Sequence, residues 1–268
     1  MCHKGLAYPL GHTFTKLEKD DYKFLEIFLD TTKANLFFSK GIILVEGWAE
    51  EILVPVIASV IGIDLTECGV SIINVGSTAY LRFAKIFQRK AFPQMKIPVA
   101  IITDVDIRTY EKNLVIDGAG KPILDDKGKS TYDYLKRDTA AVTAETTAKK
   151  TEIDKSEDNV RYFIADDWTL EYSLFKSTCM SPLFKQTAEK VHSKTNWTTD
   201  FEKKLAEKLI VKSLDKTEIA YLLAKTLLNL LATDPERTAS PLKQINEAAG
   251  KSDAIDYIIK AIKHASGN

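Results

Sequence analysis

The stretch that decides the fold is Gly41-Ile-Ile-Leu-Val45, which is followed by Glu46-Gly-Trp-Ala-Glu50. A short continuous apolar run rich in β-branched residues is typical of a strand that is buried on both faces of a parallel sheet. From Ala49 to Ile61 the apolar residues recur with helical spacing, and Pro55 is expected to kink that helix. The sequence therefore predicts a buried strand that passes through a tight turn at Gly47 into a helix.

The same alternation of strands and helices recurs along the chain. Further strands are predicted at Val70–Val75, Ile97–Thr103 and Arg161–Ala165, and a helix over Ala79–Lys90 follows the turn Gly76-Ser-Thr78. Before them, apolar residues at i, i+3 and i+4 spacing predict an amphipathic helix over Asp21–Lys40 that ends at Gly41. This order predicts an α/β fold with a parallel sheet flanked by helices, whose ligands bind outside the carboxyl ends of the strands.

Composition divides the chain into three parts. Residues 1–40 form an N-terminal segment with the helix that leads into the sheet, and residues 41–180 form the α/β domain. Within that domain, residues 108–160 have 21 of 53 residues charged and two turn signals, which predicts a polar insertion that could be mobile. Residues 181–268 show helical periodicity, strongest in Ile219–Leu231 and Ile255–Ile262, and predict a helical subdomain.

The overall composition is that of an ordinary globular protein, with 45% hydrophobic and 28% charged residues. Three cysteines without CxxC spacing support neither a disulfide framework nor a structural zinc site. The start lacks a signal-peptide pattern and the apolar run at 52–63 is too short to span a bilayer, so we expect a cytoplasmic protein without membrane contact. Lys plus Arg and Asp plus Glu number 37 each, so any DNA contact must come from local patches.

Two acidic groups follow predicted buried strands. Glu46 ends the first strand, and Glu50 lies in the first turn of the next helix. In Thr103-Asp-Val-Asp106, alternation along an extended strand end would point Asp104 and Asp106 the same way while Val105 points to the core. Carboxylates held close repel one another unless a cation neutralises them, and hard oxygen ligands suit Mg²⁺. Either pair alone is weak evidence, but their conjunction at the sheet edge predicts a divalent-metal site.

At these residues the sequence resembles a known family. The stretches IILVEGWAEEILVP, INVGSTAYLRFAKIF and IITDVD are similar to the three signature stretches of the Toprim domain in overcoming-lysogenization-defect (OLD) nucleases. The resemblance covers roughly residues 25–106 and extends more loosely, through TLEYSLF and DKTEIAYLLAK, to about residue 230. It implies a Toprim-like sheet, metal-dependent cleavage of DNA and an ATPase of the ABC type on the amino-terminal side; a role in phage defence is implied by the resemblance alone.

The resemblance also implies roles for individual residues. Glu46, Glu50, Asp104 and Asp106 match the acidic residues that hold the metal. Glu171 resembles a later glutamate that helps to hold a second ion, although Asp166 and Asp167 compete for that role. Lys216 resembles a lysine beside the scissile phosphate, where a fixed positive charge would stabilise the transition state, and Lys212 is its competitor.

Other residues are candidates for DNA contact. Ser77 and Thr78 could bind a phosphate at the start of their helix, although an ordinary N-cap explains them as well. Arg82 and Lys85 fall on one face of that helix and could follow a DNA backbone, although most such runs are solvated surface. Trp48 lies inside the acidic motif and is expected to pack rather than to stack on a base.

These observations predict a DNA endonuclease or nickase that uses a two-metal Toprim site with Mg²⁺ or Mn²⁺. The alternatives are a Toprim subunit of a topoisomerase or primase system and a catalytically inert DNA-binding subunit. No GxxxxGK[ST] stretch occurs in the 268 residues, so the ABC-type ATPase would be a missing part of the same protein or a separate chain. The broad apolar face of Asp21–Lys40 further suggests a homodimer.

Overall fold

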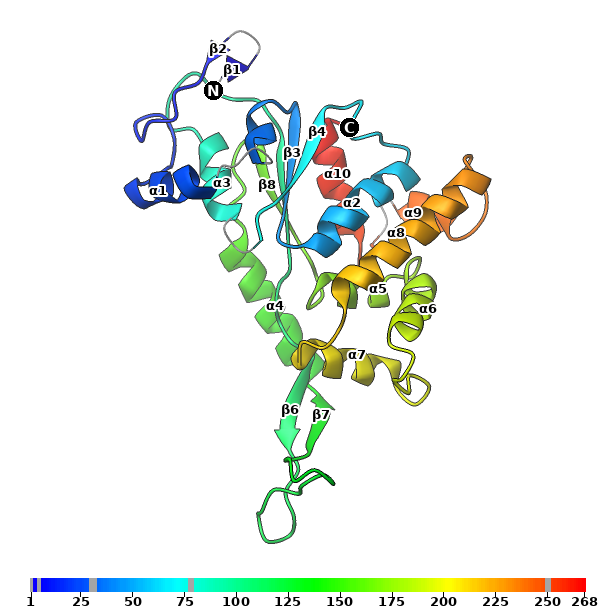
Figure 1. Cartoon of the computed structure of the whole chain (residues 1–268). Coiled ribbons are helices and arrows are strands. Elements are labelled where there is room, and N and C mark those ends of the chain that lie inside the picture. The colour runs from blue at the N-terminus through cyan, green and yellow to red at the C-terminus, as the bar shows by residue number, and fades with distance from the viewer. Residues whose placement is uncertain (1, 4–5, 29–32, 77–79, 249–251) are drawn as a thin grey trace.

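A four-stranded parallel sheet forms the centre of the protein in the computed structural model, which describes residues 2–3, 6–28, 33–76, 80–248 and 252–268. The strand order is β4-β3-β5-β8, with β3 at Gly41–Val45, β4 at Val70–Asn74, β5 at Val99–Thr103 and β8 at Val160–Ile164. All three neighbouring pairs are parallel. The predicted α/β class and all four predicted strands are confirmed (Figure 1). The central strands β3 and β5 are fully buried.

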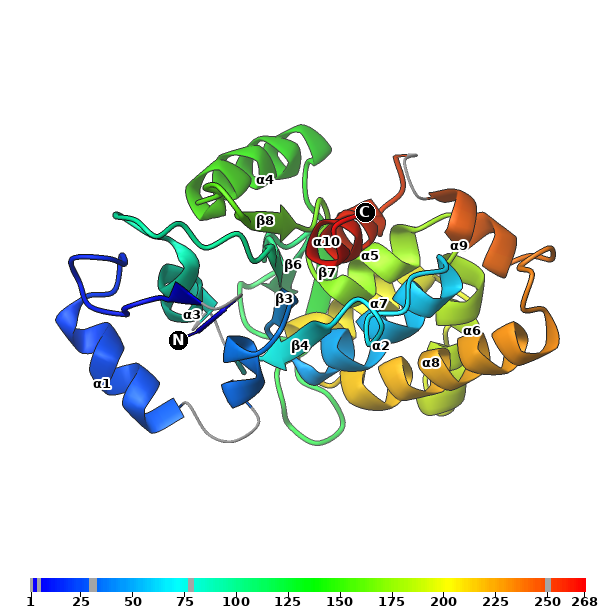
Figure 2. The same cartoon turned by 90° about the horizontal axis from the view of Figure 1, so that it is seen from above.

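Alternate residues of the central strands enter two separate cores. Ile43 and Ala100 belong to a core that also contains residues of α2 (Trp48–Val60) and of the helices from α5 onward. Ile42 and Leu44 belong to a second core with Leu25 of α1 (Lys19–Phe28) and with α3 (Tyr80–Phe87). The sheet is therefore covered on both faces, and this explains why its strands are continuous apolar runs. Seen from above, α1 and α3 lie on one side of β3, and α2 and α10 lie on the other (Figure 2).

The segment before the sheet differs from its prediction. Instead of one helix over Asp21–Lys40, the structure has α1 at Lys19–Phe28 and a separate 3-10 helix, η1, at Lys33–Phe37, with residues 29–32 outside the described part. Leu25 and Leu36 are buried as the periodicity requires, whereas Ile27 is 76% exposed. A two-stranded ladder of β1 (Cys2–His3) and β2 (Leu6–Ala7) precedes α1.

The polar insertion is built from regular elements. Strands β6 (Tyr110–Leu114) and β7 (Tyr132–Lys136) pair antiparallel and project away from the sheet, and α4 (Thr139–Ile153) returns to β8 (Figure 1). Two ion pairs connect the hairpin to α7 (Phe201–Ile210): Lys203 lies 2.7 Å from Asp133, and Lys136 lies 2.9 Å from Glu202. The charges that made this segment look irregular therefore attach it to the body of the protein.

The second half of the chain is helical, as predicted. After α5 (Leu170–Lys176) come α6 (Ser181–Val191), α7, α8 (Lys216–Thr233), α9 (Leu242–Ala248) and α10 (Asp256–Ser266). The last helix, α10, returns to the sheet and packs against β3, β5 and β8. Gly41 makes this approach possible, since a Cβ at that position would lie 1.9 Å from the carbonyl oxygen of Ala265. Among the described residues, no helix is long and apolar enough to cross a membrane.

Candidate functional site

The site begins at the carboxyl ends of the two central strands. Glu46 follows β3 directly and Asp104 follows β5, and the two strands are hydrogen-bonded neighbours running in the same direction. Both carboxylates therefore emerge at one edge of the sheet. The last residue of β5 supports this arrangement, because the buried hydroxyl of Thr103 donates a hydrogen bond to Oε1 of Glu46.

Two helices bring further glutamates to the same edge. Glu50 lies in the first turn of α2, which begins two residues after Glu46. Glu171 lies in the first turn of α5, whose N-cap Thr169 accepts a hydrogen bond from the amide of Tyr172. Glu171 is only 2% exposed, which is unusual for a carboxylate without a special role.

The two acids that competed with Glu171 point elsewhere. Asp166 forms an ion pair with Lys150 of α4, on the side of the sheet that faces the insertion. Asp167 lines a cavity beside α4, where the positive charge of Lys176 acts on it. Glu171 instead interacts electrostatically with Glu50 and Asp104, so the structure groups it with the strand-end carboxylates.

The crowding of these carboxylates changes their protonation. Burial, followed by the negative charge of Glu171, raises the pKa of Glu50 to about 7. The same two causes hold the pKa of Asp104 well above its usual value. Burial also raises the pKa of Glu46, while the hydrogen bond from Thr103 acts against this rise. Perturbation of several neighbouring acids by burial and by one another is characteristic of functional sites.

One lysine offsets part of this negative charge. The Nζ of Lys216, the first residue of α8, lies 2.8 Å from Oε2 of Glu171. Burial lowers the pKa of Lys216, but the carboxylates of Glu171 and Asp104 more than compensate, and its pKa is raised. Lys212 makes no such contact, since it lies in the exposed turn before α8.

The backbone conformation at Asp106 differs from the extended strand end that was predicted. The strand ends at Thr103, and Asp106 adopts a left-handed backbone conformation with φ 57°. Its amide donates a hydrogen bond to the carbonyl of Trp168, while its side chain is exposed. Val105 is fully buried, as predicted, but simple strand alternation does not place Asp106. Its negative charge still raises the pKa of Glu46, so it lies at the edge of the same site.

The donor chemistry of this site fits divalent cations. Five carboxylates, which are Glu46, Glu50, Asp104, Asp106 and Glu171, gather near Lys216, and carboxylates that are crowded together or buried are costly unless a cation balances them. Hard oxygen donors of this kind suit Mg²⁺ or Mn²⁺. Within the described ranges, however, no three His, Cys, Asp or Glu side chains are arranged to hold an ion. Binding would therefore require the carboxylates to change rotamer and Glu171 to share or leave Lys216.

The structure adds a tyrosine that the sequence did not single out. Tyr257 of α10 is 7% exposed, and its hydroxyl lies by that of Ser173 in a geometry too poor for a regular hydrogen bond. Burial, followed by the negative charges of Asp104 and Glu50, holds the pKa of this hydroxyl well above its usual value. Tyr257 lies more than 150 residues after Asp104, and no local pattern marks it.

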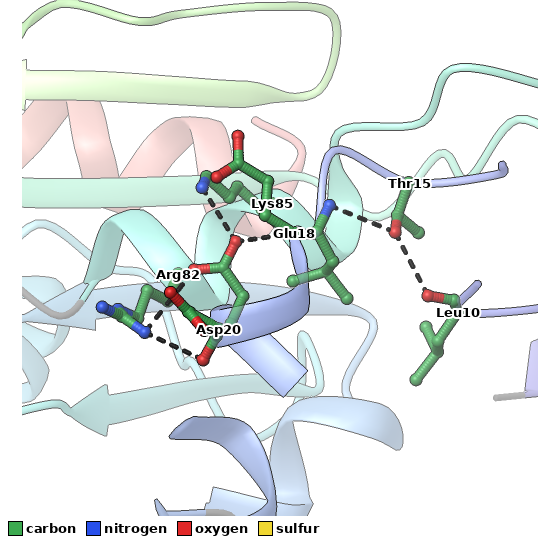
Figure 3. A network of polar contacts seen from close by, with 8 residues as sticks. Leu10, Thr15, Glu18, Asp20, Arg82 and Lys85 are labelled. Atoms are coloured by element: carbon green, nitrogen blue, oxygen red, sulfur yellow. Dashed lines mark hydrogen bonds and ion pairs between the residues drawn. The ribbon is translucent and has the colours of Figure 1, made fainter. Parts of the chain in front are cut away.

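The predicted DNA contacts on α3 are placed differently. Ser77 and Thr78 lie outside the described residues. Arg82 and Lys85 turn toward α1: Lys85 lies 2.8 Å from Oδ2 of Asp21, and Arg82 donates a hydrogen bond of 3.1 Å to the carbonyl of Asp20 (Figure 3). These two cations therefore hold α1 against α3. Their side chains stay 39% and 29% exposed, and their contact with DNA remains a prediction.

The surroundings of Trp48 also differ from the prediction. Its indole is 66% exposed instead of packed, although its neighbours Ala49 and Leu53 are buried. An exposed aromatic ring between two acidic residues of the site leaves a flat apolar face open to a ligand.

Part of the chain matches a family of known proteins. Residues 37–106 match the family model described as overcoming lysogenization defect protein-like, TOPRIM domain. No curated protein matches the chain. Among solved structures, the C-terminal region of the Xanthomonas campestris pv. campestris OLD protein is 21% identical, with 87% of this chain and 95% of that chain covered and a TM-score of 0.47. The C-terminal region of the Burkholderia pseudomallei OLD protein is also 21% identical, with 84% and 100% covered and a TM-score of 0.42.

The matched residues contain β3, β4 and β5 together with Glu46, Glu50, Asp104 and Asp106. Residues 37–106 therefore form a Toprim domain of the overcoming-lysogenization-defect type.

Proposed function

We propose that this chain hydrolyses phosphodiester bonds of DNA at divalent ions held by Glu46, Glu50, Asp104, Asp106 and Glu171. The observation that carries this proposal is the gathering of these acids, from two strand ends and two helix starts, around one lysine. Such an excess of negative charge is hard to explain as a device for stability, because each buried carboxylate costs free energy unless it is balanced. It is readily explained as a receptor for cations.

The protein's own residues would orient and neutralise the reacting groups. Divalent ions at such a site activate a water molecule and neutralise the phosphate oxygens. The hydrogen bond from Thr103 fixes the orientation of Glu46, and the N-cap Thr169 fixes the start of the helix that carries Glu171. Lys216 lies at the same edge, where its positive charge would stabilise the charge that develops on the phosphate.

The alternative enzyme classes receive less support. A topoisomerase needs a nucleophilic tyrosine. The negative charges of Asp104 and Glu50 act on Tyr257, but this side chain is buried and the pKa of its hydroxyl is strongly raised, first by burial. A nucleophilic hydroxyl needs the opposite perturbation and access to the substrate. An inert DNA-binding subunit would not require the five acids to be kept together.

We further infer that the chain works with an ABC-type ATPase and as a homodimer. The resemblance to OLD proteins supports the ATPase, and the solved relatives are themselves C-terminal regions of longer proteins. Ile27 and Phe38, which precede the first strand of the sheet, are 76% and 84% exposed. Their apolar side chains offer a surface on which a second copy of the chain could pack.

Cleavage of supercoiled plasmid by the purified chain tests the nuclease. We expect nicking or linearisation with Mg²⁺ or Mn²⁺, none with EDTA, and a loss of at least about a hundredfold for Glu46→Gln and for Asp104→Asn, which keep shape but remove the charge. Glu67→Gln is the matched control, because Glu67 is exposed in the loop between α2 and β4.

Two results would contradict the proposal. One is metal-independent cleavage, and the other is cleavage that survives in both Glu46→Gln and Asp104→Asn. If the folded chain is inactive alone, addition of the ATPase from the same source distinguishes a dependent nuclease, which becomes active, from an inert subunit, which does not.

A further inference from the structure

A cavity opens beside the carboxylate site, on the side of the helical part. Its volume is about 450 Å³, and it is bounded by the loop after β5, the start of α5, the end of α7 and the start of α8. Asp106 and Lys216 line it and also act on the carboxylates. The cavity is therefore continuous with the acidic site.

The charge of this cavity is opposite to that of the site. Four cations line it, Arg108, Lys208, Lys212 and Lys216, against the single acid Asp106. Lys216 is paired with Glu171, but no described carboxylate forms an ion pair with Arg108, Lys208 or Lys212. Three uncompensated cations at one cavity are unexpected in a chain whose charges balance overall.

A neighbouring cavity shows what an internally balanced arrangement looks like. The cavity of about 580 Å³ between α4 and α5 is also lined by cations, among them Lys136, Arg137 and Lys150. There three of the four lining cations have a partner: Glu202 for Lys136, Glu145 for Arg137 and Asp166 for Lys150. The fourth, Lys176, acts electrostatically on Asp167 and Glu202. The cavity beside the carboxylate site differs from this one, because Lys216 alone among its four cations has an ion-pair partner in the described part of the chain.

The fold fixes the backbone at the unpaired cations and also the side chain of Lys208. Lys208 lies in the last turn of α7, with its Nζ 5.8 Å from the ring centroid of Trp197. Lys212 lies in a turn with a left-handed backbone conformation, φ 55°, whose amide donates to the carbonyl of Leu209. Arg108 starts the loop that leads into the hairpin, and its carbonyl accepts a hydrogen bond of 2.9 Å from Arg137. The three cations therefore project from defined backbone positions around one cavity, which favours a shared anionic ligand.

We propose that this cavity binds the sugar-phosphate backbone of the DNA strand beside the phosphate that is cleaved, with Arg108, Lys208 and Lys212 contacting successive phosphates. This inference rests on the proposed nuclease function and names the surface through which the substrate is held. The acidic site repels a polyanion before metal binds, so the adjacent positive charge supplies the attraction that brings the strand to the metal. Asp106 and Lys216 belong to both regions, so they lie where the DNA-binding cavity meets the carboxylate site.

Fluorescence anisotropy of a labelled DNA oligonucleotide tests this surface, with Ca²⁺ in place of Mg²⁺ and a series of salt concentrations. We expect the double variant Lys208→Glu/Lys212→Glu to weaken binding by at least about tenfold, and the slope of log Kd against log salt to fall by about two. The matched control is Lys190→Glu/Lys225→Glu, which makes the same charge change at exposed lysines around a separate cavity on α6 and α8.

A second variant guards against misfolding, because Lys208 contacts Trp197. Arg108→Gln should weaken binding by about three- to tenfold and reduce the salt slope by about one, and circular dichroism should show an unchanged fold. The inference is overturned if the cavity variants bind DNA as tightly as the wild type, if the control variants lose as much affinity, or if the wild type does not bind DNA.

The two proposals can fail separately. If the wild type binds DNA through these lysines but does not cleave it with any divalent ion, the nuclease fails and the binding surface stands. If the wild type cleaves DNA, and the Lys208→Glu/Lys212→Glu variant binds and cleaves it equally well, the nuclease stands and this surface fails.

Discussion

At the scale of the residue, the ion pair between Lys216 and Glu171 couples the site to stability. Glu171 is 2% exposed, whereas Lys216 is 45% exposed, so among the described residues the lysine alone forms an ion pair with a carboxylate that water cannot reach. In EDTA we expect Lys216→Met to lower the free energy of unfolding by about 1–3 kcal/mol, because it leaves a buried charge unpaired. Urea denaturation measures this change.

Two variants control this prediction. Lys212→Met removes a neighbouring lysine that has no carboxylate partner and should change the unfolding free energy by less than about 0.5 kcal/mol. Adding Glu171→Gln to Lys216→Met should recover much of the loss, since the unpaired charge disappears. Equal losses for Lys216→Met and Lys212→Met would show that the ion pair does not contribute.

The two buried tyrosines near the site should respond differently to loss of the hydroxyl. The hydroxyl of Tyr172 donates a hydrogen bond of 2.5 Å to the carboxylate of Glu202, whereas that of Tyr257 lies by the hydroxyl of Ser173 in a geometry too poor for a regular hydrogen bond. We expect Tyr172→Phe to destabilise the protein by about 1–2 kcal/mol and Tyr257→Phe by less than about 0.5 kcal/mol. Thermal unfolding of both variants decides this; a loss for Tyr257→Phe as large as that for Tyr172→Phe would show that Tyr257 and Ser173 form a full hydrogen bond.

Residues of the site were predictable to the extent that local pattern places them. Glu46 and Asp104 follow apolar runs that could only be central strands, so their convergence followed from the topology of parallel sheets. Glu171 could be chosen over Asp166 and Asp167 only once the direction of α5 was known. Tyr257 could be assigned to the site only once α10 was seen to pack against the sheet. The pairing of Arg82 and Lys85 with Asp21 could not be predicted, because Asp21 lies on another helix.

At the scale of the element, the contact between β3 and α10 depends on a glycine. Because a Cβ at Gly41 would lie 1.9 Å from a backbone oxygen, either α10 or the strand must move to accept it. We expect Gly41→Ala to destabilise the protein by about 3 kcal/mol, at the upper end of overpacking costs. Gly118→Ala is the control, because a Cβ there meets nothing within 4 Å. A Gly41→Ala protein as stable as the control would place α10 farther from the sheet.

Elements were predictable where burial imposes a pattern and not where charge dominates. The limits of β3 follow from five consecutive buried residues, and those of α5 follow from its Thr169 cap. The hairpin β6–β7 was missed because four of the five residues of β6 are exposed, so no alternation marks it as a strand. The helix predicted over Asp21–Lys40 was too long because α1 and η1 share one apolar spacing across residues 29–32.

At the scale of the whole molecule, both halves of the chain contribute to the site. The strands and α2 supply Glu46, Glu50 and Asp104, the helical part supplies Glu171 and Lys216, and α10 then returns to cover the sheet with Tyr257. The predicted division at residue 180 therefore remains a proposal about sequence segments, while the site is built from both. Folding and metal binding should be linked through it.

This linkage should appear in the pH dependence of stability without metal. Burial and Glu171 raise the folded-state pKa of Glu50 to about 7, above the ordinary 4.5, and that of Asp104 also lies above its ordinary value. Between pH 4.5 and 7 the folded protein therefore holds more protons than the unfolded chain, and these acids make stability fall as pH rises. The loss is complete only above the folded pKa, at about pH 8.

The measurement is the unfolding midpoint in EDTA from pH 5.5 to 8, for the wild type and for Glu50→Gln/Asp104→Asn. His192 and His264, whose pKa values burial lowers, contribute a trend of opposite sign in part of this range, but they contribute equally to both proteins. We therefore expect the double variant to gain on the wild type as pH rises, by more than about 3 °C at pH 8, given about 2–4 °C per kcal/mol for a chain of this size. Mg²⁺ at pH 8 should raise the midpoint of the wild type and not that of the variant, because only the wild type keeps the charges that the cation balances. A difference that stays constant with pH, or an equal response of both proteins to Mg²⁺, would show that these carboxylates are not held together in solution.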